Sequence, residues 1–215
     1  MQGLYLVTPN WDDTAQLLNV TRAALEAGAA MVQYRHKHAG PALQRSQGAA
    51  LLALCRDYRR PLLINDHLAL CLALGADGVH LGFTDVSVAA ARAALGPGKI
   101  VGASCYGDIE RARQAERGGA TYVAFGGFYP SPVKRYTFST DPALLNTACA
   151  ELRLPLVVIG GMTPSNAAPL VARGAHMVAA ITSIYGAPDP GAAARAFGVL
   201  FAPSTTTCVK AGQAL

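Results

Sequence analysis

The chain has 215 residues, of which 52% are hydrophobic and 14% are charged. This balance predicts one compact domain with a well-buried core and excludes a disordered chain, which would need the reverse composition. The formal net charge of +5 favours anionic small substrates, but the basic residues are mostly arginines spread along the expected helices, so we expect no nucleic-acid surface.

Eight short apolar segments, expected as strands, alternate with amphipathic segments, expected as helices. In chain order the strands are expected at residues 4–8, 30–34, 61–65, 77–81, 99–103, 121–126, 155–160 and 177–181. Most are nearly continuous apolar runs, which is typical of parallel strands covered on both faces. Residues 13–27 and 87–95 show the helical period clearly. Residues 202–215 have no periodicity and are expected as a disordered tail, which leaves residues 1–201 as one domain.

A glycine-centred repeat supports the same organisation. Gly28, Gly75, Gly119 and Gly174 each close a helix just before a strand, at intervals of about 50 residues. Each interval has room for two strand–helix units, which predicts a closed parallel (β/α)8 barrel, the TIM barrel. The alternative is a doubly wound open sheet, which usually has a glycine-rich turn after its first strand, whereas here PNWDD follows that strand.

In such a barrel the chemistry lies at the carboxyl ends of the strands, and the opposite face is scaffold. The second strand runs into Gln33, Tyr34, Arg35, His36 and Lys37. Alternation along the strand points Gln33, Arg35 and Lys37 toward the barrel mouth. Two cations and an amide there can hold a multiply charged anion, although a basic turn at the surface would have a similar sequence.

Two carboxylates follow the third and fourth strands. Asn65 and Asp66 end the third strand, and Asp85 lies in the loop after the fourth. Hard oxygen ligands of this kind suit Mg2+, which keeps several waters and takes further ligands from phosphate. Asp66 and Asp85 could instead cap the helices that follow, but a pair that faces Arg35 and Lys37 favours the metal site.

The remaining strand ends supply a hydroxyl, a third cation and glycine-rich backbone. Ser104 ends the fifth strand, and the sixth leads into a stiff loop, GGFYPSPVK, that ends in Lys134. Gly160 and Gly161 follow the seventh strand, and Thr182 follows the eighth. Backbone N–H groups after these last two strands commonly hold a phosphate in this fold. We therefore expect the mouth to hold two anionic ligands, one of them beside the metal.

The cysteines and the N-terminal segment bear on the compartment. Five cysteines are scattered without a CxxC pair, which indicates reduced thiols and no zinc site. Cys105 lies beside a candidate site residue, so the sequence leaves open a nucleophilic thiol, although a small buried side chain is the commoner role. There is no run of about 18 uncharged apolar residues and no signal-like N-terminus, so we expect no membrane contact and a cytoplasmic protein.

These motifs, in this order and spacing, resemble the thiamine-phosphate synthase family from Leu4 to about Phe197. The resemblance rests on LYLVT, the Gln33–Arg35–Lys37 run, INDH, GADGVHLG with Asp85 beyond it, the Ser104 strand, FYPSPVK, IGGMTPSNA and the last strand. It implies a Mg2+-dependent transferase that joins 4-amino-2-methyl-5-hydroxymethylpyrimidine pyrophosphate to 4-methyl-5-(2-hydroxyethyl)thiazole phosphate and releases pyrophosphate. Such a reaction needs no protein nucleophile, because cations stabilise the charge that builds on the departing group.

Carried over residue by residue, the resemblance implies three groups of site residues. Asp66 and Asp85 would bind Mg2+. The pyrimidine pyrophosphate would be held by Gln33, Arg35, Lys37, Asn65, Ser104 and Lys134, with Tyr34 and His36 counted in the same substrate-binding run. Of these, Arg35, Lys37, Ser104 and Lys134 are expected to act in catalysis. The thiazole phosphate site would comprise Ser131, Pro132, Val133, Gly161, Ile181 and Thr182.

The sequence departs from the family pattern at a few positions. Phe83 and Thr84 precede Asp85, where the family usually has a glutamine and often an acid. Phe83 beside a metal site predicts a drier or reshaped pyrimidine pocket. Val133 replaces a threonine and loses its hydroxyl, whereas Thr182 replaces a common serine and keeps one.

Two alternatives stay open at this point. A thiazole tautomerase-like relative would share the barrel and transfer a proton, but it would need neither both aspartates nor the full set of cations. A non-catalytic phosphate-ligand-binding barrel would have no reason to retain every charged site residue. Both considerations favour the synthase, and association into homo-oligomers is left open.

Overall fold

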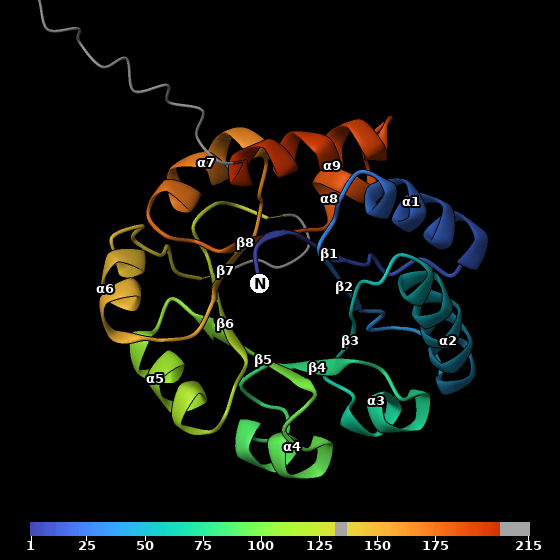
Figure 1. Cartoon of the computed structure of the whole chain (residues 1–215), viewed down its shortest axis with the longest axis horizontal. Helices are drawn as coiled ribbons and strands as arrows, with labels where there is room; N and C mark the ends of the chain where they lie inside the picture. The colour runs from blue at the N-terminus through green and yellow to red at the C-terminus, as the bar shows by residue number, and fades with distance from the viewer. Residues whose placement is uncertain (132–136, 203–215) are drawn as a thin grey trace, which may run out of the picture.

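The computed structural model describes residues 1–131 and 137–202 of the chain. Eight parallel strands close into a barrel in chain order, and helices surround it (Figure 1). The strands are β1 Gly3–Val7, β2 Met31–Tyr34, β3 Leu62–Asn65, β4 Gly78–Leu81, β5 Ile100–Tyr106, β6 Tyr122–Gly126, β7 Leu156–Ile159 and β8 Met177–Ala180. The helices are α1 Thr14–Glu26, α2 Pro41–Asp57, α3 Leu68–Leu74, α4 Val88–Leu95, α5 Ile109–Arg117, α6 Leu144–Glu151, α7 Pro164–Ala172, α8 Thr182–Tyr185 and α9 Pro190–Gly198, followed by the 3-10 turn η1 Val199–Phe201. The predicted (β/α)8 barrel is confirmed.

The ends of the elements follow local chemistry. Helix α1 begins after Asp13, whose side chain accepts a hydrogen bond from the Gln16 N–H, and α4 begins after Ser87, which caps Ala90 in the same way. Such caps typically stabilise a helix by about 1 kcal/mol. Strand β5 runs three residues beyond the predicted end, because an irregularity between Ser104 and Tyr106 shifts the register against β6 and lets pairing continue.

Alternation along each strand divides the core into two layers. In β1, Tyr5 and Val7 face the barrel interior, whereas Leu4 and Leu6 pack toward the surrounding helices. The inner layer consists of Tyr5, Val7, Met31, Leu63, Tyr122, Ala124, Val157, Met177 and Ala179. Full burial of one such large apolar side chain contributes about 1.5–3 kcal/mol to the free energy of folding. Because these side chains fill the barrel interior, they form a packed floor beneath the mouth.

The last helix completes the outer layer. Helix α9 packs against α1, so the final helix lies beside the first (Figure 1). No helix within residues 1–131 and 137–202 is long and apolar enough to cross a membrane. The tail expected from residue 202 falls, from residue 203 onward, outside the described residues.

Candidate active site

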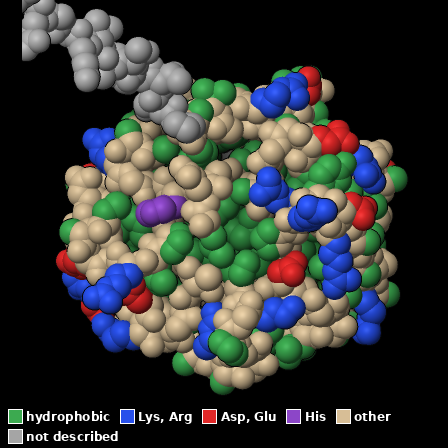
Figure 2. All heavy atoms as spheres, in the orientation of Figure 1, with side chains coloured by type: hydrophobic (Ala, Val, Ile, Leu, Met, Phe, Trp, Pro, Cys, Tyr) green, Lys and Arg blue, Asp and Glu red, His purple; other side chains and the backbone are tan. Residues whose placement is uncertain are grey.

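A cavity of about 530 Å3 lies at the carboxyl ends of the strands, a size typical of small-ligand sites. Its polar lining includes Gln33, Arg35, Lys37, Asn65, Asp66, His80, Asp85, Ser104 and Thr182. Its floor is the inner core layer, through Tyr5, Val7 and Ala124. In the view of Figure 2, apolar side chains fill the centre of the barrel and most charged side chains lie toward the edge of the molecule. The cavity therefore combines an apolar floor with a charged wall.

The charged wall centres on two aspartates and a lysine. The Lys37 Nζ lies 3.3 Å from an Asp66 Oδ2, and Asp85 accepts a hydrogen bond of 2.6 Å from the Gly82 N–H. Burial, together with the nearby Asp66, raises the pKa of Asp85 above its ordinary value. Two carboxylates this close repel each other when both are ionised, so the pair favours a cation between them.

The helix-cap alternative for these two aspartates is wrong. Helix α3 begins after His67 and α4 begins after Ser87, so neither Asp66 nor Asp85 occupies the cap position. Asp66 has a φ of 62°, a left-handed conformation that is unfavourable by about 1 kcal/mol for a residue with a side chain. Strain of this kind is commonly retained where function requires it.

The donor set suits a hard divalent cation such as Mg2+. Asp66 and Asp85 offer carboxylate oxygens, and Asn65 offers an amide oxygen beside them in the cavity wall. Within residues 1–131 and 137–202 there is no group of three or more His, Cys, Asp or Glu side chains that could hold a metal by itself. A cation held here would take its remaining ligands from water or from a phosphate, which is the usual arrangement for Mg2+.

Strand β2 presents its side chains as the alternation predicts. Gln33, Arg35 and Lys37 all line the cavity. The turn after β2 is fixed to the segment that follows β1, because the Arg35 N–H donates to the Thr8 hydroxyl at 2.7 Å and the Lys37 N–H donates to Asn10 at 3.0 Å. Arg35 and Lys37 are therefore placed on a stiff segment at the rim, where a multiply charged anion can bind both.

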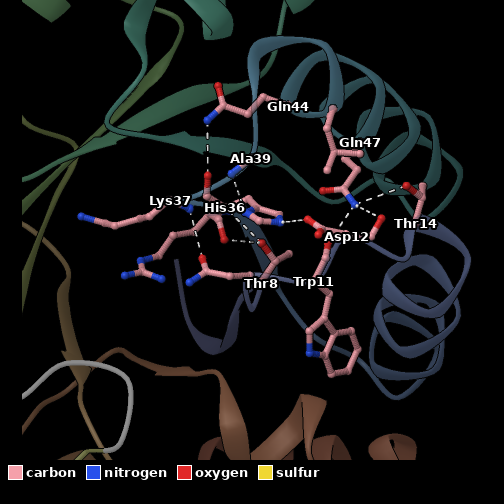
Figure 3. Close-up of polar contacts among 12 residues, drawn as sticks. Thr8, Trp11, Asp12, Thr14, His36, Lys37, Ala39, Gln44 and Gln47 are labelled. Atoms are coloured by element: carbon pink, nitrogen blue, oxygen red, sulfur yellow. Dashed lines mark hydrogen bonds and ion pairs between the residues drawn. The ribbon is translucent and has the colours of Figure 1, made fainter.

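Tyr34 and His36 do not reach this cavity. The Tyr34 hydroxyl donates to Gln47 of α2 at 3.0 Å, and the His36 ring lies 2.9 Å from an Asp12 Oδ1 while accepting from the Ala39 N–H (Figure 3). Lys37 points away from the His36–Asp12 pair (Figure 3). Tyr34 and His36 line a smaller pocket of about 120 Å3 toward α2 and α3. The same alternation that aims Arg35 inward turns these two outward.

Strand β5 brings a hydroxyl to the cavity and buries the thiol next to it. Ser104 lines the cavity, and its Oγ lies 2.9 Å from His80 Nε2. Cys105 faces the helices and is 1% exposed, and burial raises the pKa of its thiol to about 12. A thiol protonated at neutral pH is a poor nucleophile, so the structure favours the buried-hydrophobe role for Cys105.

The wall opposite the charged cluster is largely backbone. Gly160, Gly161, Ile181 and Thr182 line it, as does Ser131 in the loop after β6. Gly161 has a φ of 63°, and a Cβ there would lie 2.1 Å from the Pro130 carbonyl oxygen, so only glycine fits. Of the loop residues named from the sequence, Pro132, Val133 and Lys134 lie outside the described residues.

The expected influence of Phe83 on the pyrimidine pocket is not supported by its position. Phe83 is 63% exposed, and the Arg111 guanidinium lies over its ring at 3.9 Å from the centroid. Thr84 lines the cavity and Phe83 does not. The loop turns Phe83 outward because stacking with a cation gives the ring a partner at the surface.

Sequence reasoning missed His80 as a site residue. His80 is 7% exposed and lines the cavity from β4, between Asn65 of β3 and Ser104 of β5. The signal was available, because a histidine within the apolar strand GVHL has to face either the barrel interior or the helices, and a buried imidazole needs polar partners.

Comparisons with known proteins identify the family. The model of a family described as thiamine monophosphate synthase matches residues 4–184. The thiamine-phosphate synthase of Janthinobacterium sp. (strain Marseille) is 58% identical over 202 residues, which cover 94% of this chain and 98% of that protein. That of Methylobacillus flagellatus is 49% identical and covers 94% and 96% of the two chains. Among solved structures, the thiamine phosphate pyrophosphorylase from Pyrococcus furiosus has a TM-score of 0.82 at 30% identity, covering 93% of this chain and 95% of that one.

Proposed function

The chain belongs to the thiamine monophosphate synthase family, and from this premise we propose that its barrel mouth carries out a Mg2+-dependent condensation. The substrates are the hydroxymethylpyrimidine pyrophosphate and the hydroxyethylthiazole phosphate, and the products are thiamine phosphate and pyrophosphate. The chain is thus a transferase. The observation that carries the site assignment is the cluster of Lys37, Asp66 and Asp85 in one wall of the mouth cavity.

Asp66 and Asp85 would hold the Mg2+, which would neutralise charge on the pyrophosphate when bound. Burial and the neighbouring Asp66 raise the pKa of Asp85, and two carboxylates in contact support a shared cation. Arg35 and Lys37 bind the same pyrophosphate as fixed cations on the stiff turn after β2. Their charge stabilises the anion as it departs, which is the main catalytic contribution expected of the protein.

The other wall positions the second substrate. The backbone around Gly161 and the hydroxyls of Thr182 and Ser131 would bind the thiazole phosphate. Uncharged hydroxyl and N–H donors suit this phosphate, because it stays on the product and is not released. Gln33 and Asn65 would orient the pyrimidine. Holding the two reactants in one cavity makes the attack of the thiazole nitrogen on the pyrimidine methylene effectively unimolecular.

The two alternative functions use only part of this site. A tautomerase would be served by the wall around Gly161 alone and would leave the Lys37–Asp66–Asp85 cluster without a role. A binding module would not require a strained Asp66 beside a second carboxylate. The synthase reaction accounts for both walls. The four cysteines within the described residues are free thiols, which supports the proposal that the reaction takes place in a reducing cytoplasm.

The test is an assay of the purified protein with both substrates, with Mg2+ and after chelation. We expect thiamine phosphate and pyrophosphate in equal amounts, only when both substrates and the metal are present. No product with Mg2+ present would reject the synthase reaction. Undiminished product after complete chelation would reject the metal alone and leave the condensation standing.

A further inference from the structure

A chain of buried hydrogen bonds crosses the barrel interior beneath the cavity. The Gln33 amide Nε2 donates to the Tyr5 hydroxyl at 2.5 Å, and the Tyr5 and Tyr122 hydroxyl oxygens are 2.8 Å apart. The Tyr122 hydroxyl lies 2.7 Å from His80 Nδ1, and His80 Nε2 lies 2.9 Å from the Ser104 Oγ. The chain thus joins β2, β1, β6, β4 and β5, and it begins and ends at cavity-lining side chains.

With the Gln33 amide placed so that Nε2 faces Tyr5, the donors in this hydrogen-bond chain satisfy every bond in only one direction. The Gln33 Nε2 can only donate, so the Tyr5 oxygen accepts and its proton goes to Tyr122. The Tyr122 proton then goes to His80 Nδ1, which must be the unprotonated nitrogen. The His80 proton consequently lies on Nε2 and is donated to the Ser104 Oγ. In the opposite direction the Tyr5 proton would be left without an acceptor in an apolar interior, which is costly.

We propose that Tyr5, Tyr122 and His80 are positioning residues that fix Ser104 as a hydrogen-bond donor toward the pyrophosphate of the bound pyrimidine substrate. The inference rests on the proposed function for the identity of the ligand. Ser104 accepts from His80, so its own proton is directed to a ligand in the cavity. A hydroxyl set in advance to donate stabilises a growing negative charge without reorganising during the reaction.

The residues around this hydrogen-bond chain favour one direction of donation along it. Burial raises the pKa of Tyr5 and of Tyr122 well above the ordinary value, so both hydroxyls keep their protons. The His80 ring stacks on Tyr122 with centroids 5.7 Å apart and planes 15° from parallel. Gly102 leaves space for the Tyr122 ring, because a Cβ at Gly102 would lie 2.1 Å from Tyr122 Cζ. The stacked rings are therefore closely packed where these hydrogen bonds form.

Core filling alone does not explain these residue types. Tyr5 and Tyr122 are the two members of the inner hydrophobic cluster that carry a hydroxyl; the others are Val7, Met31, Leu63, Ala124, Val157, Met177 and Ala179. Phenylalanine at positions 5 and 122 would fill nearly the same volume without burying two hydroxyls. Polar groups in such a layer are unfavourable unless a network satisfies every one of them, and this network ends at a cavity residue.

The first test needs no catalytic activity. Nitrogen-15 NMR of the wild-type imidazoles, with His80 assigned by its absence in His80→Gln, reports which ring nitrogen carries the proton. We expect the Nε2–H tautomer for His80. The Nδ1–H tautomer would reverse the chain and overturn the inference, whether or not the protein makes thiamine phosphate.

The second test separates a role through Ser104 from a general loss of packing. Tyr122→Phe should lower kcat roughly fivefold and change the KM for thiazole phosphate less than about twofold. In a Ser104→Ala background the same change should lower kcat less than about twofold, because the group on which Tyr122 acts is gone. Equal losses in both backgrounds would overturn the inference.

Two further variants complete the kinetic test. Tyr5→Phe removes the donor to Tyr122 and should reproduce the effect in weaker form, so it serves if Tyr122→Phe fails to fold. Tyr185→Phe is the matched control, since that buried tyrosine is bonded to Thr21 of α1 and does not line the cavity; its kcat should equal that of the wild type. If the wild-type enzyme makes no product, the proposed function fails, and the NMR measurement still decides the inference.

Discussion

Replacing Gly161 with alanine tests the close approach that shapes the backbone wall of the cavity. A Cβ at Gly161 would lie 2.1 Å from the Pro130 carbonyl oxygen, far inside van der Waals contact. Gly75 provides a matched control, because its φ of 65° is nearly the 63° of Gly161 and a Cβ at Gly75 would meet nothing within 4 Å. The two substitutions therefore share the backbone strain and differ in the collision.

The magnitude follows from these two contributions. An alanine in the left-handed region costs about 1–2 kcal/mol of folding free energy at either position. The overlap with Pro130 forces a backbone shift at Gly161 only, which adds about 1–3 kcal/mol. Gly161→Ala should therefore lose about 2–5 kcal/mol. For a chain of this length each kcal/mol lowers Tm by about 2–4 °C.

Urea unfolding followed by circular dichroism measures both variants against the wild type. Gly161→Ala should also raise the KM for thiazole phosphate, because Pro130 and Ser131 line the cavity and shift together. Gly75→Ala, at the end of α3, should leave that KM unchanged. Equal losses of stability in the two variants would refute the close approach, and an unchanged KM in Gly161→Ala would separate this wall from the thiazole phosphate.

Further predictions concern the charged residues and the thiol. Asp85→Asn should cut the rate at least about tenfold, which is a loss of about 1.4 kcal/mol of transition-state stabilisation. The control Asp57→Asn, at an exposed position, should leave the rate unchanged. Full activity of Asp85→Asn in limiting Mg2+ would contradict a metal site at Asp85. Burial and Asp66 raise the pKa of Asp85, and a metal binds the ionised form of the carboxylate. Mg2+ binding measured by calorimetry should therefore release protons and weaken as pH falls through that raised pKa, and pH-independent binding would contradict this. Lys134→Ala should lower kcat more than it raises the KM for thiazole phosphate, and the opposite would exchange the two anion sites. Cys105→Ala should retain most activity, whereas a loss as large as that of Lys134→Ala would indicate covalent catalysis.

Much of the fold could be predicted because its signals are local. Buried parallel strands appear as short apolar runs, and helix ends appear as glycines or capping residues, so all eight strands are found within a few residues of their predicted positions. The end of β5 lies beyond its predicted position, since the irregularity near Ser104 depends on pairing with β6, a contact between separate segments.

The site residues also fall into those that local sequence signals predict and those that depend on contacts between separate segments. The sequence by itself determined that Gln33, Arg35, Lys37, Asp66 and Asp85 would gather at one mouth, because a closed barrel brings all strand ends to one rim and alternation fixes which side chains face it. The same alternation, applied one residue further, would have turned Tyr34 and His36 away.

Only the tertiary structure decided how side chains from distant strands meet. The outward turn of Phe83 onto Arg111, the contact of Gly161 with Pro130, and the chain from Tyr5 through Tyr122 to Ser104 each join segments far apart in sequence. No local pattern encodes such contacts, because a residue's propensity and periodicity reflect its own backbone, whereas a hydrogen-bond partner or a steric limit is set by whichever strand the closed barrel places opposite.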